Sequence, residues 1–128
     1  MTTTYAAAGE LLEELMAARI DHGGDALTAL FTPDAEFVPD PFATPITGHN
    51  GLRAYLLAAA GAEQGYDLSI ERHWVSGDTV LAAWHASWTR SADDAKVRQA
   101  GFLSAEVGGD GRIVRLRYWS VTREHLAG

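Results

Sequence analysis

The chain has 128 residues, no cysteine and a formal net charge of −7. This length suits one domain covering residues 1–128 that buries its core without disulfides, and the lack of cysteine excludes thiolate nucleophiles and thiolate metal sites. The acidic balance argues against nucleic acid as a partner, because negative charge repels the phosphate backbone.

The sequence contains no apolar run near the ~20 residues that cross a bilayer, so we expect no membrane partner. Its short polar N-terminus lacks the basic region and apolar stretch of a secretory signal. We therefore expect a cytoplasmic protein.

Helices are predicted in the first half of the sequence. Between residues 5 and 22, apolar side chains recur at helical spacing at Leu11, Leu12, Leu15, Met16 and Ile20. Further helices are predicted over residues 25–31 and 48–62, with a short strand over 35–38 between them. The prolines that follow this strand make the next stretch irregular.

Four strands are predicted in the second half, over residues 67–75, 79–89, 97–107 and 113–122. Gly77 and Asp78 suit a two-residue hairpin turn, because glycine accepts positive φ, and the glycine-rich segment 108–111 predicts a second hairpin. Helices first and strands later are typical of an α+β domain, here a long antiparallel meander packed on helices.

Both faces of the predicted strand 79–89 are partly apolar. One face carries Val80, Ala82, Trp84, Ala86 and Trp88, and the other carries Leu81, Ala83, His85 and Ser87. Exposed aromatic patches usually mark an interface, so one interpretation places Trp84, Trp88 and Trp119 on an outer sheet face that forms a homodimer. In the alternative, these tryptophans face the helices and the small residues face solvent.

In the first interpretation, the remaining sheet face looks toward the helices. It combines apolar bulk with polar groups and carries Ala83, His85, Ser87, Leu103, Leu116 and Tyr118. Such a mixture is typical of a ligand pocket, because a packed core does not readily hold polar groups without hydrogen-bond partners. We therefore expect a small, largely apolar organic ligand.

The register of the first hairpin decides whether Arg72 belongs to this pocket. With the predicted two-residue turn, Arg72 pairs with Ala83, so Arg72 and Trp74 lie on the pocket face and Arg72 could bind a carboxylate or a ligand oxygen. A slip of one residue would send Arg72 outside and bring His73 in.

Three segments carry a family resemblance: Leu30 to Ala35, Pro45 to Leu52 and Gly109 to Val114. They resemble the SnoaL-like polyketide cyclase and ketosteroid isomerase group of nuclear transport factor 2-like proteins, over nearly the whole chain. The resemblance implies a cone-shaped, curved antiparallel sheet packed on three N-terminal helices, with a pocket between sheet and helices. It does not imply one activity, because this fold hosts many functions.

Asp40 and Pro41 match the place at which ketosteroid isomerases carry the Asp-Pro that supplies their general base. By this resemblance, Asp40 would take a proton from carbon beside a carbonyl, helped by apolar walls that raise its basicity. Asp before Pro is also common in turns, so a turn aspartate is the competing interpretation.

The other parts of the isomerase site are not matched. Ala17 and Leu103 occupy the places of its oxyanion donors, and Phe31 replaces a supporting tyrosine. His85 and Tyr118 are the groups that we expect to polarise or orient a substrate oxygen instead. Their alternatives are a buried structural histidine and a core tyrosine bonded to backbone.

The histidines show no short paired spacing, and no phosphate-cradling motif is present, so we expect neither a metal nor a cofactor. The leading hypothesis is a cofactor-independent enzyme for the isomerisation, cyclisation or dehydration of an apolar carbonyl or phenolic compound. Its expected catalytic residues are Asp40, His85 and Tyr118, and its expected substrate-binding residues are Tyr55, Arg72, Trp74, Ser87, Leu103 and Leu116.

Two alternatives stay open. The first is a non-catalytic ligand-binding or dimerisation domain, which the unmatched oxyanion donors favour. The second is an epoxide hydrolase, for which we expect an arginine between two carboxylates in the pocket. Asp40 with Arg72 supplies only part of that set.

Overall fold

The structure is a computed structural model that describes residues 2–126. Its helices are α1 (Tyr5–Ile20), α2 (Gly24–Thr28) and α3 (Gly48–Ala62). Its strands are β1 (Phe31–Val38), β2 (Ile46–Thr47), β3 (Glu63–Ser76), β4 (Thr79–Arg90), β5 (Lys96–Val107) and β6 (Ile113–His125). In this part of the chain no helix is long and apolar enough to cross a membrane.

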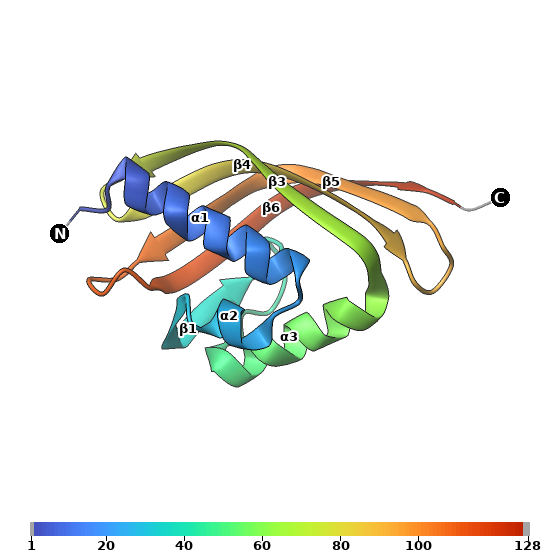
Figure 1. Ribbon diagram of the computed structural model, residues 1–128, viewed down its shortest axis with the longest axis horizontal. Coiled ribbons are helices and arrows are strands. Elements are labelled where there is room, and N and C mark those ends of the chain that lie inside the picture. The colour runs from blue at the N-terminus through green and yellow to red at the C-terminus, as the bar shows by residue number, and fades with distance from the viewer. Residues whose placement is uncertain (1, 127–128) are drawn as a thin grey trace.

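The strands form one six-stranded mixed sheet in the order β2-β1-β6-β5-β4-β3. The meander from β3 to β6 is antiparallel, as predicted, and the first hairpin pairs Ser76 with Thr79 around the expected turn. Two features lie outside the sequence prediction: the short strand β2, and the parallel pairing of β1 with β6. Figure 1 shows a curved sheet with all three helices gathered on one side of it.

The helices cover the face of β4 that carries its tryptophans, which is opposite to the face expected from sequence. Val80, Ala82, Trp84 and Ala86 are buried, whereas Leu81, His85 and Ser87 are exposed. Turning the bulkier side chains toward the helices removes more apolar surface from water, and this favours the observed orientation. The prediction that Trp84 and Trp88 form an outer interface is therefore wrong. Trp119 does face outward, at the opposite surface of β6.

Arg72 lies outside because it pairs with Ala83 on the uncovered face of β4, and a register shift in β3 separates it from Leu68. Arg72 pairs with Ala83, as predicted, but two residues of β3 stand opposite one residue of β4 between Ile70 and Arg72. Such a bulge reverses the alternation of side chains along the strand. Leu68 is therefore buried on the helix side, while Arg72 and Trp74 lie on the outer face with Ala83.

Gly101 lies in β5, between Trp84 on β4 and Ser120 on β6. A Cβ atom added at this position would lie 1.9 Å from the backbone oxygen of Trp119 and 2.8 Å from the Cα of Ser120. Backbone atoms cannot move aside as a flexible side chain can. Glycine is therefore required where β5 and β6 approach each other this closely.

Gly101→Ala should destabilise the protein by about 1–3 kcal/mol, because the added methyl group forces β5 and β6 apart. Gly109→Ala is the matched control, since no atom lies within 4 Å of a Cβ there. Urea unfolding followed by tryptophan fluorescence measures both free energies of unfolding. Equal stability of the two variants would contradict the close approach of β5 and β6.

Candidate functional site

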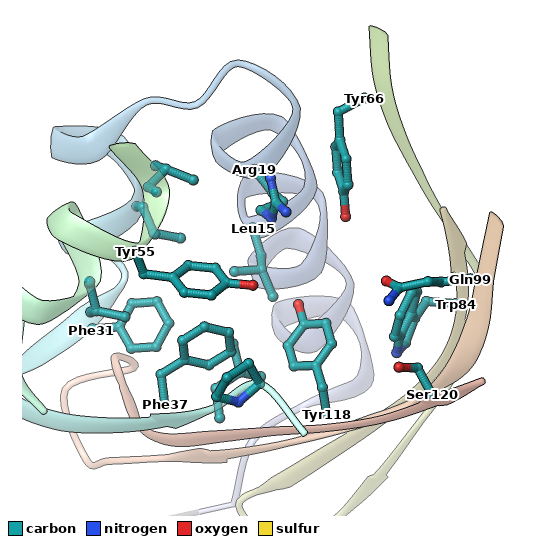
Figure 2. Close-up of a pocket in the computed structure, with 15 residues that line it drawn as sticks. Leu15, Arg19, Phe31, Phe37, Tyr55, Tyr66, Trp84, Gln99, Tyr118 and Ser120 are labelled. Carbon is teal, nitrogen blue, oxygen red and sulfur yellow. The ribbon is translucent and has the colours of Figure 1, made fainter. Parts of the chain in front are cut away.

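A cavity of about 90 Å³ lies between the helices and the inner face of the sheet. Its apolar walls come from Leu15, Leu27, Phe31, Phe37, Pro39, Leu52, Leu56 and Leu116. Its polar lining consists of Arg19, Tyr55, Tyr66, Trp84, Gln99, Tyr118 and Ser120 (Figure 2). An apolar cavity with a few convergent polar groups is the usual form of a small-molecule site.

Three tyrosine side chains from three different elements meet in this cavity. Tyr55 comes from α3, Tyr66 from β3 and Tyr118 from β6, and Figure 2 shows their hydroxyl groups directed into the same space. The ring of Phe37 holds two of them edge-on, with centroids 5.0 Å from Tyr55 and 5.7 Å from Tyr118. Edge-to-face contacts of this kind fix ring orientation as well as bury area.

Burial raises the pKa of all three tyrosines and so favours their protonated form. It raises the pKa of Tyr66 to about 12, although the positive charge of Arg19 opposes the shift. Burial also raises the pKa of Tyr118 well above the ordinary value for tyrosine, and that of Tyr55 in the same direction. At neutral pH all three hydroxyls can therefore donate a hydrogen bond to a ligand oxygen.

Arg19 and Glu63 form a largely buried ion pair at the edge of the cavity. Arg19 Nη1 and Nη2 each donate to one oxygen of Glu63, both at 2.9 Å, and His22 Nε2 lies 3.3 Å from the same carboxylate. The guanidinium carbon of Arg19 stands 3.9 Å from the ring centroid of Tyr66. Burial alone would lower the pKa of Arg19, but the bonds to Glu63 outweigh it and the net shift is upward.

At the sheet side of the cavity, Trp84 contributes its indole Nε1–H, which has no hydrogen-bond partner within residues 2–126. Gln99 and Ser120 line the cavity from the neighbouring strands β5 and β6 (Figure 2). Amide and hydroxyl groups can both donate and accept, whereas indole can only donate. The cavity is therefore rich in donors.

Three of the residues predicted from sequence line the cavity, namely Tyr55, Leu116 and Tyr118. Leu103 faces the same side but is buried in the core outside the lining. Sequence reasoning missed Arg19, Tyr66 and Gln99. For Arg19 a signal existed, because it lies four residues after Leu15 and so continues the buried stripe of α1.

Four predicted pocket residues lie on the outer face of the sheet instead: His85, Ser87, Arg72 and Trp74. His85 Nδ1 lies 3.1 Å from Oε1 of Glu71, and both side chains are more than half exposed. Arg72 stands over the ring of Trp74, 5.1 Å from its centroid. The expected placement of these residues in the pocket is wrong, because the helices cover the other face of β4, and Arg72 and Trp74 pair with Ala83 and Leu81 on the uncovered face.

Asp40 has the geometry of a turn aspartate. It is exposed, its Oδ1 accepts a hydrogen bond of 3.0 Å from the backbone N–H of Phe42, and its carbonyl oxygen accepts one from Ala43. Its carboxylate does not line the cavity, but Pro39, the residue before it, does. The charge of Asp40 is among the influences that raise the pKa of Tyr55. Asp40 therefore lies near the rim of the cavity.

Among residues 2–126, no group of three or more His, Asp or Glu side chains is placed to hold a metal ion.

The raised pKa values predict a loss of stability at alkaline pH. Below pH 10 the cavity tyrosines are protonated in both folded and unfolded chains; above it they ionise first in the unfolded chain, and this favours unfolding until the pKa of the folded state is passed. For Tyr66, whose pKa is about 12 in the folded protein, the loss reaches about 1 kcal/mol by pH 11. Urea unfolding of the protein and of Tyr66→Phe between pH 8 and 11 measures it. The variant should lose less stability over this range, and identical pH dependence would contradict the assignment.

The comparisons with known proteins agree with this architecture. The family model of the SnoaL-like domain matches residues 12–116. No curated protein shows significant sequence similarity to the chain. Among solved structures, SalBIII, the epoxide hydrolase/cyclase-like enzyme in pyran ring formation in the polyether salinomycin, superposes with a TM-score of 0.80 at 18% identity, covering 89% of this chain and 90% of that one.

Two further structures have the same fold. A nuclear transport factor 2-like protein from Burkholderia xenovorans has a TM-score of 0.73 at 17% identity and covers 92% of each chain. An LEH-like epoxide hydrolase from Mycobacterium tuberculosis has a TM-score of 0.75 at 21% identity, covering 91% of this chain and 84% of that one. At these identities the likeness concerns the fold. Since the matched family model spans most of the sequence, the chain belongs to the SnoaL-like domain family and has the nuclear transport factor 2-like fold.

Proposed function

We propose that the chain binds a small, largely apolar carbonyl or phenolic compound in this cavity and converts it by cofactor-independent acid–base chemistry. The reaction types that fit are isomerisation, cyclisation and dehydration. The observation that carries the proposal is the convergence of three protonated tyrosine hydroxyls, from Tyr55, Tyr66 and Tyr118, in an otherwise apolar cavity.

These hydroxyls suit a substrate oxygen that gains negative charge during the reaction. A carbonyl oxygen becomes enolate-like when a proton leaves the neighbouring carbon, and prepositioned donors in a water-poor site stabilise that charge. Tyr118 is the donor whose ring is fixed from two sides, by Phe37 and Trp84, at centroid distances of 5.7 Å and 5.3 Å. The guanidinium of Arg19 lies at the cavity edge, where it is paired with Glu63.

Asp40 remains the candidate proton acceptor, as the family resemblance implies, acting from the rim of the cavity. Its support is its position directly after Pro39, which lines the cavity. Binding without turnover is the competing function. It is favoured by the absence of any carboxylate from the cavity lining within the described residues, since Glu63 lies beyond the lining and is paired with Arg19 and His22.

Epoxide opening is supported less well. The fold is shared with SalBIII and with the mycobacterial epoxide hydrolase. Yet the arginine in this cavity, Arg19, is paired with the single carboxylate of Glu63, which His22 also contacts, whereas we expected an arginine between two carboxylates. Arg72, the arginine first considered for this role, lies on the outer face.

Tyr118→Phe and Asp40→Asn separate these functions. For an enzyme, Tyr118→Phe should weaken turnover by about 10²–10³-fold, the usual cost of one oxyanion donor. Asp40→Asn should keep ligand affinity and lose turnover. The assay combines a thermal-shift panel of small ketones, enones, phenols and epoxides with turnover measurements on the compounds that bind. Binding that survives in both variants, with no turnover in the parent protein, would identify a binding domain.

We further propose that the outer sheet face forms a homodimer. Exposed apolar side chains cross all four strands of the meander on this face, at Trp74, Leu81, Phe102, Trp119 and Val121. Trp74 and Phe102 already contact each other, with ring centroids 6.5 Å apart. A contiguous patch of this composition is typical of a protein–protein interface.

Charges on the same face support a two-fold arrangement. Asp67, Ser87, Arg98 and Arg123 lie in one row across β3 to β6. A two-fold axis parallel to the strands, between β4 and β5, sets β3 of one copy against β6 of the other. Asp67 of each copy then faces Arg123 of the other, which relieves the repulsion between the adjacent Arg98 and Arg123.

Phe102→Asp should convert the dimer into monomers, because it places a charge in the centre of the apolar patch. Leu57→Asp is the matched control: Leu57 is also exposed, by 77% against 56% for Phe102, but it lies on α3 and away from the outer sheet face. Sedimentation equilibrium gives the mass of each variant. A parent protein that is monomeric at all concentrations, or a Phe102→Asp variant that stays dimeric, would contradict this interface.

A further inference from the structure

Trp84 carries a buried polar group that the protein itself does not satisfy. The residue lies in the middle of β4 and is only 3% exposed, and its indole Nε1–H has no hydrogen-bond partner among residues 2–126. A buried tryptophan N–H usually has a partner, because leaving it without one forfeits the hydrogen bond it makes to water in the unfolded chain. An exception inside a ligand cavity therefore points to the ligand.

The surroundings of Trp84 leave its indole open to the cavity. Its cross-strand neighbour on β5 is Gly101, which has no side chain, and the ring of Tyr118 stands 5.3 Å from the indole, centroid to centroid. Gln99 and Ser120 line the same part of the cavity (Figure 2). The indole N–H of Trp84 therefore lies on the sheet side of the cavity, apart from the hydroxyl of Tyr55 on the helix side.

The chemistry of the lining restricts what the ligand can present to Trp84. Indole only donates, so the matching ligand atom must be an acceptor such as an ether, carbonyl or hydroxyl oxygen. The volume of about 90 Å³ restricts its size. A cavity of about 150 Å³ holds benzene in another protein, so a ligand enclosed by this smaller cavity is no larger than one ring.

We propose that Trp84 Nε1–H is a second anchoring donor and that the ligand is a single-ring compound with two separate acceptor oxygens. One oxygen meets the tyrosine hydroxyls and the other meets Trp84. The inference rests on the proposed function, because it assumes that this cavity is the ligand site. It adds a specificity-determining residue and narrows the ligand from any apolar carbonyl compound to a doubly oxygenated ring.

Two probes of nearly equal size test the second oxygen. Cyclohexanone has one acceptor, and tetrahydropyran-4-one replaces its opposite CH₂ group by an ether oxygen. Affinities come from NMR titration of the ¹⁵N-labelled protein, in which the indole signal of Trp84 is assigned as the one missing from Trp84→Phe. We expect tetrahydropyran-4-one to bind about threefold to tenfold more tightly, the usual value of one neutral hydrogen bond, and to shift the Trp84 indole proton downfield. Cyclohexanone should bind without that downfield shift.

A substitution that removes only the N–H provides the second readout. Replacing Trp84 by 3-benzothienylalanine puts sulfur in place of the indole nitrogen and keeps the shape of the ring system. The ligand-free variant should melt at a higher temperature than the parent, because an unsatisfied buried donor has been removed, and it should bind the two ketones equally. A purely structural tryptophan would give a lower melting temperature and no change in ligand preference.

The outcomes distinguish a failure of the anchoring role of Trp84 from a failure of the proposed function. If both ketones bind the parent protein equally, or if the 3-benzothienylalanine variant keeps the preference for tetrahydropyran-4-one, Trp84 is not an anchoring donor and the proposed function is unaffected. If neither ketone binds, and no compound of the thermal-shift panel binds either, the cavity is not a ligand site and both proposals are overturned.

Discussion

The ion pair between Arg19 and Glu63 is the interaction on which the candidate site depends. It joins the last turn of α1 to the first residue of β3, two segments that are 44 positions apart in sequence, through two hydrogen bonds of 2.9 Å. Because both side chains are largely buried, the loss of Glu63 would leave the charge of Arg19 without compensation, which typically costs about 3–5 kcal/mol. The same guanidinium lies against the ring of Tyr66 and so positions one of the three cavity tyrosines.

This ion pair also determines the chemical character of the cavity. Glu63, the carboxylate nearest to Arg19, is occupied by Arg19 and His22, and the polar groups that remain in the lining are mostly donors. Burial raises the pKa of the tyrosines and keeps them in the donating form. A donor-rich apolar cavity suits a ligand with acceptor oxygens.

The two faces of the sheet have different surroundings in this fold. The inner face packs against the helices and lines the cavity, and Gly101 allows β5 and β6 to approach each other closely. The outer face carries exposed aromatic side chains and a row of polar and charged residues. Trp84 and Trp119 illustrate the division, since one is buried in the cavity wall and the other is exposed on the outer surface.

The sequence by itself determined the local structure and the family. Helical spacing in α1 and α3, and the Gly77-Asp78 turn that pairs Ser76 with Thr79, follow from interactions between neighbours in the chain, so they were predictable. Alternation along β4 separated its side chains into two groups correctly, but it could not tell which group the helices cover, because that depends on packing between distant segments. The bulge before Arg72 and the meeting of Arg19, Tyr66 and Gln99 at one cavity were likewise decided only by the tertiary structure, in which α1, β3 and β5 come together.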